Sequence, residues 1–133
     1  MKLVDTSFLI DLSKNLPEAV KKSFELDNEA KVFCTEVSVY EIILGIYAIK
    51  NINYSNKIQK LEMMFKNFHI LGLDHSSAVK AGEISGMLAR EGKTISDADC
   101  MIVGIALANG INTIVTRDRE HFQRIKGIVV EGY

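Results

Sequence analysis

The sequence predicts an α/β fold in which helices flank a five-stranded, mainly parallel sheet. Five short runs rich in β-branched and apolar residues recur along the 133 residues. Segments with the apolar spacing of helices separate these runs, and the chain has a single proline, Pro17, with no Gly/Ser-rich linker and no repeat. Strands that alternate with helices form parallel sheets, because each helix carries the chain back to the same edge. We therefore expect one domain over residues 1–133.

The first part of the chain contains two expected strands and two expected helices. Residues 2–5 (KLVD) are a short apolar run that ends in an acid, and residues 7–14 continue with apolar side chains at helical spacing. Pro17 suits the first turn of a second helix, over residues 17–26, because a backbone N–H would have no partner there. The run VFCT (32–35) is the second expected strand.

The middle of the chain repeats this alternation. Residues 38–50 form a strongly apolar helical pattern, and residues 54–67 carry one apolar stripe at helical spacing. The run FHILGL (68–73) is the third expected strand. A longer helix is expected over residues 74–90, with Gly92 just past its end, where glycine commonly terminates helices.

The last part of the chain contains the most apolar helix and two strands. Residues 96–109 have few polar positions beyond their first turn, so we expect a buried helix that ends before Gly110. The run TIVT (113–116) is the fourth expected strand. A short helix over residues 119–124 then leads to the fifth strand, GIVVE, at 127–131.

Composition and charge exclude several classes of protein. The 16 basic and 17 acidic residues give a net charge of −1, so the chain is not a broadly basic nucleic-acid-binding protein. Its longest apolar runs, 42–49 and 100–108, are much shorter than the ~20 residues of a membrane span. Asp5 interrupts the N-terminus, which resembles no secretion signal. Cys34 and Cys100 lie in apolar surroundings without metal-type spacing. We expect a cytoplasmic protein with reduced, buried cysteines and no membrane contact.

Acidic residues follow the expected strands at the edge where ligands bind in open α/β sheets. Asp5 ends the first strand, and Asp118 follows the fourth strand closely. Glu41 lies in the first turn of the helix that follows the second strand, while Asp97 and Asp99 lie in the first turn of the buried helix. The sequence therefore predicts that acids from four separate segments meet at one edge of the sheet.

Each of these acids also has an ordinary structural explanation. Glu41 completes a Ser38-x-x-Glu41 capping box, and Asp99 completes the similar pattern Ser96-x-x-Asp99. Asp118 has the position of a turn or N-cap residue. Taken one at a time, these explanations compete with the site hypothesis.

Asp5 and Asp97 differ in how well helix capping explains them. The hydroxyls of Thr6 and Ser7 follow Asp5 directly and could cap the next helix, so capping explains Asp5 poorly. Asp97 at a helix start is more simply a cap. We rank it below Asp99, which shares a stripe of the helix with the apolar residues Ile102, Val103 and Ala106.

Considered together, the acids favour a metal site. Two carboxylates about 4 Å apart repel by roughly 4 kcal/mol at an effective dielectric constant of 20. Three or four such groups would cost much of the ~5–15 kcal/mol by which a domain is stable, unless a cation or shared protons compensate. Oxygen ligands suit Mg²⁺ or Mn²⁺, and no His/Cys set here suits zinc. Such ions assist the hydrolysis of phosphodiester bonds.

Four segments together resemble a known family. The segments LVDTSFLIDL, SVYEIILG, ISDADCMIVGIALANG and TIVTRDREHF are similar, in order and separation, to the motifs of PIN domains, and specifically of the VapC-type ribonuclease toxins of type II toxin–antitoxin systems. The resemblance extends from Lys2 to about Val130. Gly104 stands where we expect an alanine in this family, which we interpret as a conservative packing change.

The resemblance implies a three-layer fold with strand order 3-2-1-4-5 and a homodimer. It also implies a Mg²⁺- or Mn²⁺-dependent endoribonuclease that is inhibited by a cognate antitoxin protein. The metal-binding carboxylates implied by the resemblance are Asp5, Glu41, Asp99 and Asp118. Thr6 or Thr116 would be the supporting polar group, and Asp97 an accessory ligand.

The positions of these residues at the strand and helix ends suggest a role for each. Asp5 is the central ligand, Asp99 and Asp118 approach from the other side, and Glu41 either binds the metal through water or acts as general base. RNA contact requires positive charge near this edge, and an ordinary solvated helix face is the alternative for the nearest basic residues. These residues are Arg117, Arg119, Arg124 and Lys126.

The sequence assigns no catalytic role to His121 or to the apolar faces of residues 38–65. His121, beside Phe122, is interpreted as a packed or hydrogen-bonded residue and not as a ligand. The apolar faces of residues 38–65 exceed what one sheet needs, so a dimer or antitoxin surface is an alternative to core packing.

Other function classes fit the sequence less well. A receiver-type signalling domain needs a phospho-acceptor Asp after strand three and a Lys after strand five, and the fifth expected strand is followed by no Lys. A phosphatase with an Asp-x-Asp nucleophile needs a second acid where Ser7 stands. An RNA-processing nuclease that is not a toxin uses the same residues, and a catalytically inactive binding module is disfavoured by the full set of acids.

Overall fold

The computed structural model describes all residues, 1–133, and contains one five-stranded parallel sheet of order β3-β2-β1-β4-β5, as the resemblance implied. The central strand β1 pairs with β2 on one side and β4 on the other, with Leu3 opposite Phe33 and Ile114. The strands are β1 (Lys2–Val4), β2 (Val32–Thr35), β3 (His69–Leu71), β4 (Thr113–Val115) and β5 (Val129–Glu131).

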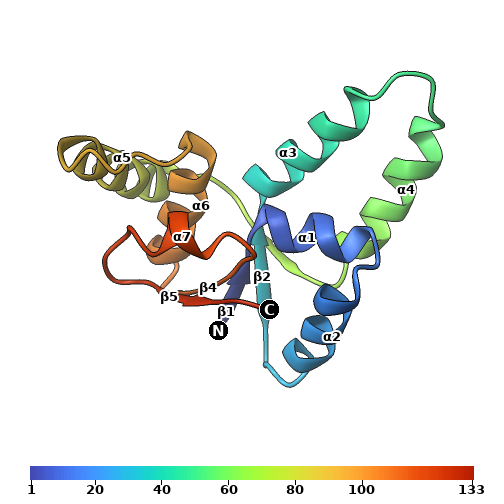
Figure 1. The fold of residues 1–133 in the computed structure, drawn as a ribbon, viewed down its shortest axis with the longest axis horizontal. Coiled ribbons are helices and arrows are strands. Elements are labelled where there is room, and N and C mark those ends of the chain that lie inside the picture. Colours follow the sequence, from blue (N-terminus) through green and yellow to red (C-terminus); the bar gives the residue numbers. More distant parts are fainter.

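Helices cover both faces of this sheet, which gives three layers. In Figure 1, α5, α6 and α7 lie to the left of the strands, and α1 to α4 lie to the right. The helices are α1 (Thr6–Ser13), α2 (Pro17–Leu26), α3 (Glu36–Tyr47), α4 (Tyr54–Phe65), α5 (His75–Arg90), α6 (Asp97–Ala108) and α7 (Arg119–Phe122). None of these helices is long and apolar enough to span a membrane.

Two apolar cores hold the layers together, one on each face of the sheet. Neighbouring strand residues point to opposite faces, so Leu3 packs in the core beneath α5 and α6, whereas Val4 packs in the core beneath α1 and α3. The predicted burial of α6 is confirmed, because six of its residues are buried. Cys34 and Cys100 are buried and unpaired, as expected.

One helix boundary differs from the prediction in a way that matters for the site. Helix α3 begins at Glu36, because the Thr35 hydroxyl accepts a hydrogen bond from the Ser38 N–H at 3.1 Å and caps the helix. Ser38 is therefore inside the helix, and the predicted Ser38-x-x-Glu41 capping box is wrong. Glu41 lies in the second turn of α3 and not in the first, so capping does not explain it.

Gly104 allows α5 and α6 to approach closely. A Cβ atom at this position would lie 2.7 Å from the Ser77 carbonyl oxygen and 2.8 Å from the Ala81 backbone nitrogen. Both are backbone atoms of α5 and cannot move aside without shifting that helix. The interpretation of Gly104 as a conservative replacement for alanine is therefore wrong for this chain.

Replacing Gly104 with alanine should destabilise the protein by about 1–3 kcal/mol, the usual cost of overpacking a core. The matched control is Gly86→Ala on α5, where a Cβ meets open space and the better helix propensity of alanine stabilises by about 0.5–1 kcal/mol. Urea denaturation of both variants provides the measurement. Equal stability of Gly104→Ala and the wild type would contradict the close helix packing described above.

Candidate active site

Asp5 occupies the junction between β1 and α1 and is almost fully buried, with 3% of its surface exposed. Its Oδ1 caps α1 by accepting the Phe8 N–H at 3.0 Å, and it also accepts the Ser7 hydroxyl at 2.7 Å. Its Oδ2 accepts the Thr116 hydroxyl at 2.6 Å. Asp5 is thus the N-cap after all, and the expectation that the Thr6 or Ser7 hydroxyl would cap this helix is wrong.

The environment of Asp5 favours its neutral form when no cation is present. Burial raises the pKa of this carboxyl to about 6, against the lowering effect of hydrogen bonds from Thr116, Phe8 and Ser7. The negative charge of Asp99 raises the pKa further. A buried carboxylate with three donors and a nearby like charge is an environment that a bound cation would stabilise.

Glu41 reaches the same end of the sheet from α3. The Thr6 hydroxyl donates to Glu41 Oε1 at 2.6 Å, and the Ser38 hydroxyl lies 2.8 Å from the Thr6 hydroxyl. The two hydroxyls expected to support the site therefore hold different carboxylates: Thr6 orients Glu41, and Thr116 orients Asp5.

Asp99 lies in the first turn of α6 and faces the other acids. The Ser96 hydroxyl accepts the Asp99 N–H at 3.1 Å, so Ser96 is the N-cap. Burial is the largest effect on the Asp99 carboxyl and raises its pKa. A hydrogen bond with Ser96 and the charge of His121 lower that pKa, while the charges of Glu41 and Asp118 raise it. Two acids from other segments, Glu41 and Asp118, therefore act electrostatically on Asp99.

Asp118 stands at the N-cap position of α7 but makes no side-chain capping hydrogen bond, so the prediction of a capping role is wrong. Its backbone N–H donates to Thr116 Oγ1 at 2.8 Å. Its Oδ2 lies 2.5 Å from His121 Nδ1, one turn further along α7. The carboxylate is held by an imidazole and remains about 40% exposed.

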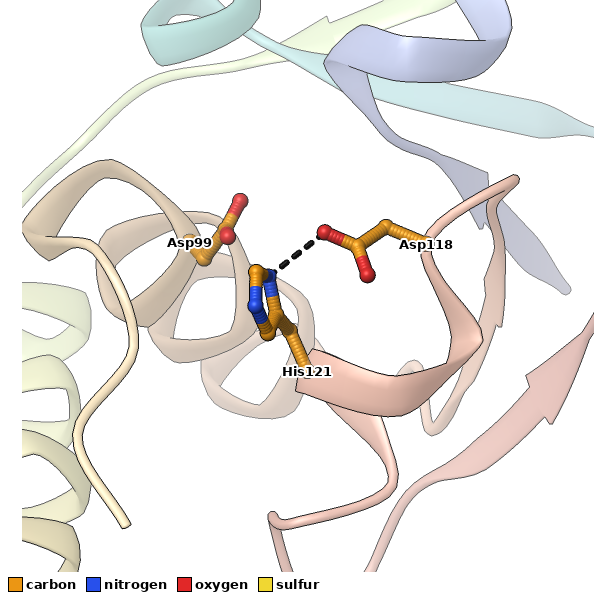
Figure 2. A group of neighbouring side chains, drawn as sticks. All are labelled: Asp99, Asp118 and His121. Atoms are coloured by element: carbon orange, nitrogen blue, oxygen red, sulfur yellow. Dashed lines mark ion pairs between the residues drawn. The ribbon is translucent and has the colours of Figure 1, made fainter.

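Figure 2 shows how Asp99, Asp118 and His121 share one space. Asp99 enters from α6, whereas Asp118 and His121 come from the start of α7, and the polar groups of all three point toward one another. One potential ligand atom from each lies within 4.8 Å of the other two, so this group could hold a metal ion. His121 was predicted to be packed or hydrogen-bonded, and it lies in close contact with Asp118, but its place beside Asp99 was missed.

Comparison with known proteins identifies the family. The family model described as "PIN domain" matches residues 2–128 of the chain. The chain belongs to the PIN domain family. It is 30% identical over 131 residues to the tRNA(fMet)-specific endonuclease VapC of Shigella flexneri, an alignment that covers 98% of this chain and 96% of that protein.

Solved structures share the PIN fold along nearly the whole chain. A structure of DNA-bound VapBC from Salmonella typhimurium is 29% identical, with a TM-score of 0.86, and covers 98% of this chain and 96% of its own. VapBC2 from Rickettsia felis, bound to a DNA fragment from its promoter, has a TM-score of 0.88 at 19% identity and covers 99% and 98% of the two chains.

Asp97 is more exposed than the other predicted metal ligands on α6 and β1. It is the first residue of α6 and is exposed, whereas Asp99 is half-buried and Asp5 is buried. A negative charge at this position favours the N-terminal end of the helix dipole. The role of Asp97 as an accessory ligand stays a prediction.

The four basic residues that were predicted to contact RNA do not form one patch. Arg117 donates to the buried carboxylate of Asp11 at 2.6 Å, and the Arg119 guanidinium fills the space beside Gly132. Arg124 donates to the Thr94 carbonyl at 3.0 Å, and with Lys126 it lines a separate polar hollow. Contact of these residues with RNA stays a prediction, and Arg117 is the weakest candidate because a buried acid already pairs with it.

The network around Asp11 was missed at the sequence level. Asp11 is 3% exposed on the inner face of α1, where Arg117 and the Tyr133 hydroxyl, which donates at 2.6 Å, satisfy its carboxylate. The Tyr133 ring packs edge-on against Phe8 at 5.2 Å. This network ties the segment between Thr116 and Asp118 to α1, which fixes the position of two site residues.

Proposed function

We propose that this PIN domain is a metal-dependent endoribonuclease that hydrolyses RNA phosphodiester bonds with Mg²⁺ or Mn²⁺. The observation that carries the proposal is the meeting of acids from four segments at one end of the sheet. The charges of Glu41 and Asp118 raise the pKa of Asp99, and the charge of Asp99 raises the pKa of Asp5. Mutual repulsion of this kind is compensated when a hard cation binds.

The residues present fit such an ion. Asp99 and Asp118, whose ligand atoms lie close together, would hold it, with Asp5 as a further carboxylate that the Thr116 hydroxyl keeps oriented. When bound, a divalent ion polarises the phosphoryl oxygen and lowers the pKa of water. Glu41 is half-buried and accepts a hydrogen bond from Thr6, and it would act as the general base that accepts a proton from the attacking water.

The relatives favour a toxin that is controlled by a partner protein. The curated relative is named VapC, and the solved neighbours are VapBC complexes. We infer that a cognate antitoxin binds the apolar hollow of about 1040 Å³ between α2 and α4, which includes Phe24, Ile46, Leu61 and Met64 among its lining residues. This assignment takes up the alternative, raised from the sequence, that apolar side chains of residues 38–65 form a dimer or antitoxin surface and do not only pack in the core.

A homodimer and a cytoplasmic location complete the proposal. Tyr40, Leu44 and Tyr47 are 66%, 55% and 58% exposed and follow one another at helical spacing along α3. An exposed apolar stripe of this kind favours contact with a second copy of the chain. A nuclease of cellular RNA works where that RNA is, and residues 1–133 would act as a single domain.

Other functions fit less well. A receiver-type domain has strand order 2-1-3-4-5, whereas this sheet has the order 3-2-1-4-5. An RNA-processing nuclease without a toxin role remains the second candidate, because it would use the same acids. Only its substrate and its partner would differ.

Cleavage of a labelled RNA pool tests the proposal. The pool should contain structured transfer, ribosomal and messenger RNA, including initiator tRNA, for which the Shigella flexneri relative is named. Purified full-length protein should cut with Mg²⁺ or Mn²⁺ and stop cutting in EDTA, and mapping the ends would reveal the target. Cleavage that continues unchanged in EDTA would contradict metal dependence, and the absence of any cleavage with either ion would overturn the proposed activity.

A further inference from the structure

We propose that His121 is a nitrogen ligand of the cation held by Asp99 and Asp118, so that the site has mixed oxygen and nitrogen donors. This inference rests on the proposed metal-dependent function and deepens it. The distinctive feature is an imidazole among acids that would otherwise offer only oxygen ligands. Its consequence is a stronger preference for transition metals over Mg²⁺ than carboxylates alone would give.

The position of His121 on α7 carries the first part of the argument. Asp118 and His121 are three residues apart, a spacing that places two side chains on one face of a helical turn. An acid and a histidine at this spacing chelate one metal in helical-bundle proteins. Phe122, 1% exposed, and Ile125, 6% exposed, anchor the segment in the core, so the ring is held in place.

The distances carry the second part. Ligand atoms that share an octahedral ion lie about 3 Å apart when adjacent and about 4 Å apart when opposite, given bond lengths near 2.1 Å. The ligand atoms of Asp99, Asp118 and His121 all lie within 4.8 Å of one another. His121 Nδ1 and Asp118 Oδ2 lie 2.5 Å apart. Only a small separation of this pair would bring the two atoms to the spacing of adjacent ligands of one ion.

A purely orienting role for His121 is the competing explanation. In that case Nδ1–H donates to Asp118, and the imidazole touches only the carboxylate and not the ion. Asparagine distinguishes the two roles, because its amide N–H can still donate to Asp118 but offers no imidazole nitrogen to a metal. His121→Asn is therefore the decisive variant, and His69→Asn on the exposed edge strand β3 is the matched control.

Pulsed electron paramagnetic resonance of bound Mn²⁺ tests the inference on tag-free, full-length protein. The wild type should show a directly coordinated imidazole nitrogen. The coupling should change when only the histidines carry ¹⁵N, persist in His69→Asn, and vanish in His121→Asn. Competition binding should show that His121→Asn weakens Mn²⁺ binding by about tenfold or more and Mg²⁺ binding by less.

The outcomes separate this inference from the proposed function. Bound Mn²⁺ without nitrogen coupling in the wild type, or with coupling that persists in His121→Asn, would overturn the ligand role and leave the metal site standing. Wild-type protein that binds no Mn²⁺ would overturn both proposals. The isotope exchange needs no variant, so the test holds even if His121→Asn folds poorly.

Discussion

Replacing Asp5 with asparagine is expected to reduce RNA cleavage by about two orders of magnitude or more while the protein stays folded. Asparagine keeps an oxygen that can accept the Phe8 N–H and so preserves the cap of α1. It removes the negative charge that faces Asp99 and presents no carboxylate oxygen beside the Thr116 hydroxyl. The loss of activity would therefore come from the lost metal ligand and not from unfolding. Gel-based cleavage assays and thermal unfolding in the same buffer measure both effects.

Asp74→Asn is the matched control for Asp5→Asn. Both variants neutralise an aspartate that caps a helix, but Asp74 caps α5, where it accepts the Ser77 N–H at 2.9 Å, and is exposed. We expect Asp74→Asn to retain most of the activity. An Asp5→Asn variant that cleaves within threefold of the wild type, or that unfolds at a lower temperature than the wild type in EDTA, would contradict the clustered-carboxylate explanation.

The second large effect is expected in the stability of the metal-free protein. The pKa of Asp5 rises from an ordinary value of 3.8 to about 6 in the folded state, so the folded protein holds a proton that the unfolded chain releases. Stability from this group is fully present below pH 4 and is lost as the pH rises through about 6. The shift corresponds to about 3 kcal/mol, and Asp99, whose pKa is also raised, acts in the same direction.

Chemical denaturation in EDTA between pH 4 and pH 8 measures most of this loss. The unfolding free energy of the wild type relative to Asp5→Asn should fall across the range, because the asparagine variant lacks the titrating group. The lowered pKa of Glu131 favours folding at higher pH, but it is common to both proteins and cancels in the comparison. A divalent ion at a concentration of about 100 times its Kd should increase the unfolding free energy of the wild type by about 2.7 kcal/mol. If the difference in unfolding free energy between the wild type and Asp5→Asn did not change with pH, the raised pKa of Asp5 would be contradicted.

Much of the fold could be predicted from the sequence because the apolar patterns are strong. Every expected strand and helix is present, and the errors are confined to the ends of elements. The start of α3 was misplaced because Thr35 and Ser38 are both good caps, and only the tertiary structure shows that Thr35 receives the Ser38 N–H. The position of Glu41 in the helix was wrong for that reason.

The site was predictable to the extent that it depends on strand ends. Asp5 and Asp118 could be placed because parallel strands bring their ends to one edge, and Asp99 because the helix that leads into the next parallel strand begins at that same edge. The contacts of Asp11 with Arg117 and Tyr133 could not be predicted, because these two partners lie 106 and 122 positions away from Asp11 in the sequence. His121 did carry a local signal, its spacing of three residues from Asp118, but one such spacing is too common to identify a ligand without Asp99 beside it.

Binding of Mn²⁺ to the wild type and to single amide variants tests the central claim most directly, namely that acids from separate segments share one cation. Free Mn²⁺ can be followed by its electron paramagnetic resonance signal during titration. We predict saturable binding by the wild type and Asp74→Asn, and loss of at least tenfold in affinity for Asp5→Asn and Asp99→Asn, about the minimum expected for a lost ligand. Binding that is equally tight in all four proteins would show that these carboxylates do not hold the metal.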